Sequence, residues 1–110
     1  MSKHRLILNE SHINRGMRKI CGACPLALAL NDMLNRQAVR VTGVYFSFYE
    51  SFPGDFLTYC INVTLPAVIS NWVYNFDNQD EVYPFEYDVE ISEIDRRSCT
   101  AKLTIINENN

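Results

Sequence analysis

The chain has few of the features that mark a common enzyme class or a membrane protein. Its 110 residues include only two histidines and four glycines, and no Gly-x-Gly-x-x-Gly or P-loop phosphate-binding motif. No apolar run is long enough to span a bilayer, and the apolar stretch near Met1 is too short for a signal peptide. We therefore expect a cytoplasmic protein that has no membrane attachment and no P-loop chemistry.

The composition is that of a folded globular domain. Hydrophobic residues make up 47% of the chain and charged residues 21%. A chain of this length predicts one domain over residues 1–110, with a polar and frayed tail at 107–110. Without a signal peptide, the four cysteines are expected to be thiols and not a disulfide framework.

The charge is distributed unevenly although its total is only −3. Residues 1–40 carry seven Lys or Arg and two Asp or Glu, whereas residues 41–110 carry three and eleven. This asymmetry is typical of a protein whose solvent-exposed faces differ in charge. It also fits two surfaces that bind two partners, or self-association into a homodimer.

The hydrophobic pattern predicts an α+β fold. The predicted strands cover residues 3–8, 39–49, 56–63, 85–91 and 99–106, with a bulge near Gly43. The predicted helices cover residues 25–35 and a segment capped by Thr64, with one further turn that starts at Ser11. We expect an antiparallel sheet of four to five strands with two helices packed on one face.

The segment before the first long helix is basic and contains glycine. Pro25 favours the first helical position, so Cys24 should be the N-cap of this helix. Unpaired N–H groups and partial positive charge at a helix start can hold an anion. The predicted ligand site, for phosphate or a nucleotide, comprises His12, Arg15, Gly16, Arg18, Lys19, Gly22 and Cys24.

Part of the chain resembles a known group of proteins. The pattern His12-Ile-x-x-Gly16 is followed by Cys24-Pro-Leu-Ala-Leu-Ala-Leu30, and further matches extend to Tyr87. Over residues 12–87 the chain is similar to short bacteriophage and prophage proteins that have no assigned activity. The resemblance implies a virus-encoded accessory protein in the bacterial cytoplasm, and it supplies no catalytic residue.

A second candidate surface is acidic. Alternation from Phe85 to Ile91 places Glu86, Asp88 and Glu90 on one face of a strand, about 7 Å apart. Such a row is usually the polar face of a half-buried strand, and it can also imitate nucleic acid in the basic groove of a partner protein.

Thiol and metal chemistry are further alternatives. Cys21-x-x-Cys24 has the spacing of a zinc knuckle or a redox pair, but no second paired motif supplies two more zinc ligands. Cys60 and Cys99 are expected in the core. His12 and Cys24 lack an evident third group for nucleophilic catalysis, so His12 is predicted to be structural.

The leading hypothesis from the sequence is a non-catalytic accessory protein that inhibits a host defence or regulatory factor. Its expected partner is a host protein or a small nucleotide signal, and no cofactor, metal or direct contact with nucleic acid is expected. The first alternative is a sponge that binds a nucleotide signal at the basic loop. The second alternative is a thiol or zinc protein that uses Cys21 and Cys24.

Overall fold

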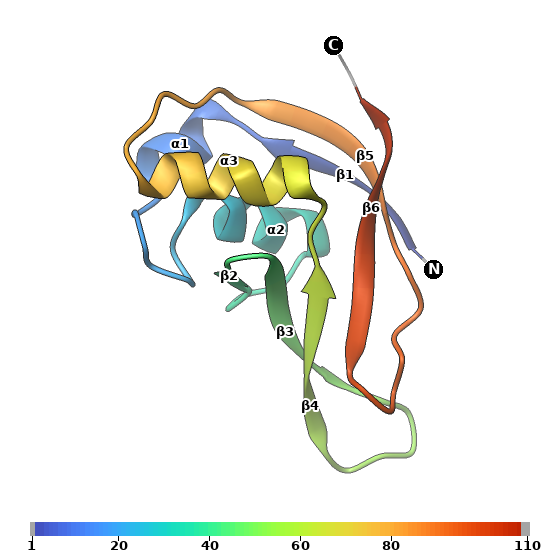
Figure 1. Cartoon of the computed structure of the whole chain (residues 1–110). Helices are drawn as coiled ribbons and strands as arrows, with labels where there is room; N and C mark the ends of the chain where they lie inside the picture. The colour runs from blue at the N-terminus through green and yellow to red at the C-terminus, as the bar shows by residue number, and fades with distance from the viewer. Residues whose placement is uncertain (1, 109–110) are drawn as a thin grey trace.

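The computed structural model describes residues 2–108, with side chains for residues 2–106. Within this range lie three helices and six strands, in an α+β arrangement (Figure 1). In chain order these are β1 (Ser2–Leu8), α1 (Glu10–Arg15), α2 (Pro25–Leu34), β2 (Arg40–Thr42), β3 (Tyr45–Ser51), β4 (Thr58–Thr64), α3 (Ala67–Asp77), β5 (Phe85–Ile91) and β6 (Thr100–Glu108).

The strands form one mixed sheet in the order β1-β5-β6-β4-β3-β2. Four of its strand pairs are antiparallel, and β4 pairs with β6 in parallel, with Val63 opposite Ala101. The expected antiparallel sheet of four to five strands is therefore wrong in strand number and in direction. After β4 the chain forms α3 and β5 and then returns as β6, which lies beside β4. A connection of this length permits a parallel pair.

The sixth strand arises because the predicted strand at 39–49 is split at Gly43. Residues 43 and 44 form a two-residue turn, since Thr42 pairs directly with Tyr45. Gly43 has a φ of 57° at the first turn position, where a type II′ hairpin turn favours glycine. The residue marks a tight turn, and the expected bulge is wrong.

The predicted cap of α2 is confirmed, whereas the predicted caps of the other two helices are wrong. Cys24 is the N-cap of α2, and its Sγ accepts the Ala27 N–H at 3.4 Å. The helical turn predicted to start at Ser11 is the longer helix α1, and Asn9 is its N-cap. Pro66 and not Thr64 is the N-cap of α3, because Thr64 is still paired in β4.

One core cluster joins the sheet to the helices. Its largest fully buried side chains include Leu6, Leu30, Phe46, Ile69 and Leu103, from β1, α2, β3, α3 and β6. The helices lie together on one side of the curled sheet (Figure 1). The opposite face of β1 and β5 therefore carries the exposed alternate residues, among them Arg5 and Glu86.

The β3–β4 hairpin extends away from the helices, and the loop between β5 and β6 lies beside its tip (Figure 1). Arg96 of that loop stacks on the Phe52 ring at 4.0 Å, which joins the two loops. Strands β3 and β4 pair from Tyr45 opposite Thr64 to Ser51 opposite Thr58, and the tip of this hairpin forms one end of the molecule (Figure 1).

Two further observations concern the ends of the chain and the membrane. Residues 107 and 108 of the predicted frayed tail continue β6, and residues 109 and 110 lie outside the described residues. Among the helices that the structure describes, none combines the length and apolar character that crossing a membrane requires.

Candidate functional site: a three-walled pocket and an exposed loop

The basic segment folds into a loop whose three basic side chains contact different parts of the protein. Arg15 donates from Nε to Ser11 Oγ at 3.1 Å. Arg18 donates from Nε to the Phe76 carbonyl at 3.2 Å and stacks over the Phe76 ring. Lys19 lines a pocket with Cys21 and Cys24. The structure therefore does not bring the three predicted cations together around one anion.

His12 has a structural role. Its Nδ1 accepts the Asn9 N–H at 3.0 Å, so the neutral ring carries its proton on Nε2, and Nε2 donates to Asp32 at 2.7 Å. Asn9 in turn accepts the His12 N–H, which completes a capping box for α1. Both ring nitrogens are occupied, and His12 is 3% exposed, as expected of a structural histidine.

The two glycines of the predicted ligand site differ in their surroundings. A Cβ at Gly16 would overlap the ring of Pro25, because the loop passes directly against the start of α2. A Cβ at Gly22 would meet nothing within 4 Å. Gly16 is thus explained by close packing, whereas nothing in the structure requires glycine at position 22.

The cysteine thiols differ in how far they are buried. Burial raises the pKa of the Cys24 thiol, and the hydrogen bonds from Ala27 and Leu26 offset only part of this effect. Cys60 is exposed on the outer side of β4 opposite Tyr49, so the expectation that it lies in the core is wrong, whereas Cys99 is partly buried and packs against the core cluster. The alternation of β4 places Ile61 and Val63 inward and Cys60 outward.

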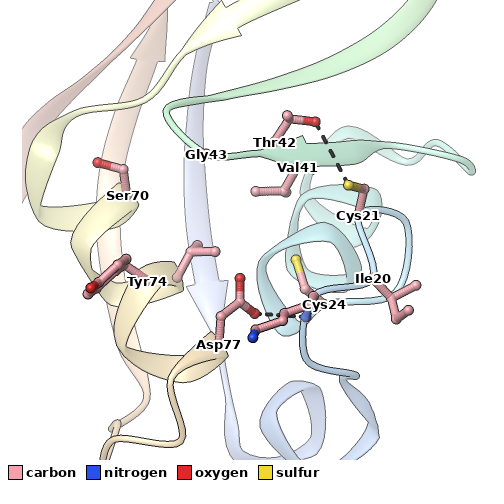
Figure 2. Close-up of a pocket in the computed structure, with 11 residues that line it drawn as sticks. Ile20, Cys21, Cys24, Val41, Thr42, Gly43, Ser70, Tyr74 and Asp77 are labelled. Carbon is pink, nitrogen blue, oxygen red and sulfur yellow. Dashed lines mark hydrogen bonds between the residues drawn. The ribbon is translucent and has the colours of Figure 1, made fainter.

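No group of three or more His, Cys, Asp or Glu side chains among the described residues is arranged to hold a metal ion. Cys21 instead lies near Thr42, whose hydroxyl is 4.0 Å from Sγ (Figure 2).

The acidic strand is confirmed as β5, but its charge is partly neutralised. Arg5 of β1 contacts Glu86 at 2.7 Å and Asp88 at 2.6 Å. Lys3 is the register partner of Glu90 in the same strand pair. The face formed by the three carboxylates is therefore a mixed array of charges.

An apolar cavity lies between three segments that are distant in sequence. Its walls are the basic loop at residues 19–24, the β2–β3 turn and one side of α3, and its volume is about 280 Å³. Most of the lining is apolar, with Ile20, Val41, Val73 and Tyr74 among its members. We call this cavity the three-walled pocket (Figure 2).

One carboxylate dominates the polar part of the three-walled pocket. The Asp77 Oδ1 accepts the Lys19 N–H at 2.9 Å, and the other carboxylate oxygen points into the space between α3 and the β2–β3 turn (Figure 2). The Lys19 backbone has a φ of 61°, a left-handed conformation that this hydrogen bond helps to hold. Of the predicted ligand residues, Lys19 and Cys24 line this pocket.

The second notable surface is the β3–β4 loop. The side chain of Phe56 is fully exposed, at 103% of its reference area, and that of Leu57 is 62% exposed. The loop is nonetheless braced, because Asp55 accepts the Leu57 N–H at 3.0 Å and the Tyr59 hydroxyl at 2.6 Å. These two hydrogen bonds lower the pKa of Asp55, with the Tyr59 contribution the larger.

Neither Asp77 nor the β3–β4 loop is among the sites predicted from the sequence. Asp77 lies 58 residues from Lys19 in the chain, so its position across from Lys19 depends on tertiary packing. The predicted strand at 56–63 includes Phe56 and Leu57, whereas β4 begins at Thr58 and both residues lie in the loop before it.

Comparisons with known proteins do not identify this chain. No family model, curated protein or solved structure matches it.

Proposed function

We propose that this protein is a non-catalytic inhibitor that binds a host protein through its β3–β4 loop. The observation that carries this proposal is the exposure of Phe56 and Leu57 on a loop that is held in shape from within. Adjacent exposed apolar side chains on a rigid element are typical of residues that anchor a protein–protein interface.

The energetics favour this loop as a contact element. Burying a Phe or Leu side chain in a partner gains about 1.5–3 kcal/mol each. The bonds made by Asp55 already order the backbone, so binding avoids much of the entropy cost of fixing a loop. The stacking of Arg96 on Phe52 supports the base of the same loop.

The groups that suggested chemistry support a role without catalysis. His12 uses both ring nitrogens within α1 and its contact with Asp32, and Cys24 caps α2 with a buried thiol. The resemblance of residues 12–87 to phage-encoded accessory proteins supports a host protein in the bacterial cytoplasm as the partner. The loop is favoured over the acidic strand because Arg5 already pairs with Glu86 and Asp88.

The test places a photocrosslinking phenylalanine analogue at position 56 of the protein expressed in its bacterial host. We expect one host protein to crosslink from position 56 and not from position 44, where Val44 is also exposed at the other end of β3. The purified partner should then bind the wild-type protein with 1:1 stoichiometry. Phe56→Ser should weaken this binding at least about tenfold, the equivalent of 1.4 kcal/mol.

Two controls separate this proposal from its rivals. Asp88→Lys should leave the affinity unchanged, whereas a loss of affinity that also depends on salt would assign the contact to the acidic strand. Equal binding by wild type and Phe56→Ser would contradict a role for the loop. Inactivation of the partner at substoichiometric amounts would contradict a non-catalytic mechanism.

A further inference from the structure

The three-walled pocket has the features of a small-ligand site, and it is remote from Phe56 along the length of β3. It is a concave space of about 280 Å³ with mostly apolar walls and few polar groups. Sites for small molecules commonly combine such walls with a few placed hydrogen-bonding groups. The Tyr74 ring, which is 68% exposed at the pocket, offers a surface on which a flat ring can stack.

The Asp77 carboxylate determines which hydrogen-bonding groups a ligand of the pocket must carry. One oxygen is committed to the Lys19 N–H, and the other faces the cavity (Figure 2). A carboxylate accepts several hydrogen bonds and donates none when ionised. A ligand that fills this pocket must therefore present hydrogen-bond donors to Asp77.

The charge around the pocket favours a ligand whose ring is neutral. Lys19 lines the same cavity, so its positive charge balances that of Asp77 and reduces the gain from a cationic ligand. A guanine base carries two adjacent N–H donor groups on its Watson–Crick edge, whereas adenine presents a single amino donor beside the N1 acceptor. Proteins recognise unpaired bases through this edge and through stacking on aromatic rings.

We propose that the three-walled pocket binds the guanine base of a nucleotide. Asp77 accepts the N–H donors of the base, and Tyr74 stacks on the ring. This site is independent of the partner contact made by the β3–β4 loop. It also differs from the predicted anion site, since Arg15 and Arg18 take no part in it.

The experiment titrates the purified protein with guanosine monophosphate and adenosine monophosphate, and follows the backbone amide signals by NMR. We expect guanosine monophosphate to shift the signals of Lys19, Thr42 and Ser70 and to bind at least about tenfold more tightly, since hydrogen bonds to a charged group differ from unmade ones by this much. No binding, or equal binding of the two nucleotides, would overturn the proposal.

The variant Asp77→Asn gives the sharper result. The new side chain keeps an acceptor for the Lys19 N–H and places an NH₂ donor where the second oxygen lies. The preference for guanosine monophosphate should disappear, and this variant should bind adenosine monophosphate at least as tightly as it binds guanosine monophosphate. An unchanged preference in this variant would show that Asp77 does not read the base.

Two measurements control for indirect effects. Asp80→Asn removes a nearby exposed carboxylate that does not line the pocket, and it should leave both affinities unchanged. Thermal unfolding of both variants should match that of the wild type. Binding of tyramine in place of the nucleotides, lost in Asp77→Asn, would replace the guanine assignment by a site for organic cations.

Discussion

At the residue scale, the loop before α2 shows how close packing determines residue choice. Gly16 ends α1 and lies directly against the Pro25 ring, so the absence of a side chain permits the loop to pass there. Its φ is −72°, which any residue can adopt, and the requirement for glycine is therefore steric. Gly22, six residues later in the same loop, has open space around it.

This contrast predicts different effects of the same substitution. Gly16→Ala should lower the free energy of unfolding by about 1–3 kcal/mol, because the added methyl group forces the loop away from Pro25. Gly22→Ala should change it by less than about 0.5 kcal/mol. Urea unfolding of both variants measures the difference, and equal stabilities would contradict the packing argument.

The cysteines give a second prediction at this scale. Burial raises the pKa of Cys24, so little of its thiol is ionised at neutral pH, and iodoacetamide should modify it much more slowly than the exposed Cys60. Mass spectrometry of the folded protein at pH 7 reads both rates. Alkylation of Cys24 at the rate of Cys60 would instead support the thiol-protein alternative.

At the scale of elements, the β3–β4 loop depends on the ionised form of Asp55. Hydrogen bonds from Tyr59 and Leu57 lower the pKa of Asp55 in the folded protein. The same contact raises the pKa of Tyr59, because Asp55 accepts a hydrogen bond from the protonated phenol. The geometry that presents Phe56 is therefore coupled to a titratable pair.

This coupling predicts a loss of loop order in acid. Because the folded pKa lies below the unfolded value of about 3.9, the stabilisation is complete above that value and is lost as the pH falls through the folded pKa. NMR titration of the Leu57 amide should show this transition. Tyr59→Phe should move the transition to higher pH, and an unmoved midpoint would contradict the role of the phenol.

At the scale of the whole molecule, the buried residues that hold the fold are distinct from the exposed residues that we propose face a partner. Phe46 and Phe56 are the same residue type at the two ends of one hairpin, but Phe46 is fully buried in the core cluster and Phe56 is fully exposed. The two ends of the hairpin thus have different physical tasks.

Replacement of each phenylalanine by alanine tests this division. Phe46→Ala should lower the free energy of unfolding by about 3–5 kcal/mol, through lost burial and the cavity that remains. Phe56→Ala should change it by less than about 0.5 kcal/mol. Chemical denaturation measures both, and a large loss of stability in Phe56→Ala would show that this side chain serves folding.

The sequence by itself determined the elements whose signals are local. Pro25 and the Sγ of Cys24 define the start of α2 within four residues of chain. Alternation of apolar and acidic residues identified β5 with its observed bounds, Phe85–Ile91. These elements depend on hydrogen bonds and side-chain periods that neighbouring residues supply, so a short window of sequence is sufficient to predict them.

Only the tertiary structure decided how distant segments meet. The parallel pairing of β4 with β6, the salt bridges from Arg5 to β5 and the position of Asp77 across from Lys19 all join residues far apart in the chain. The direction of the three basic side chains, and the exposure of Cys60 and Phe56, follow from the same packing. Because long-range contacts are selected by the shape and burial of the complete core, no local pattern in the sequence specifies them.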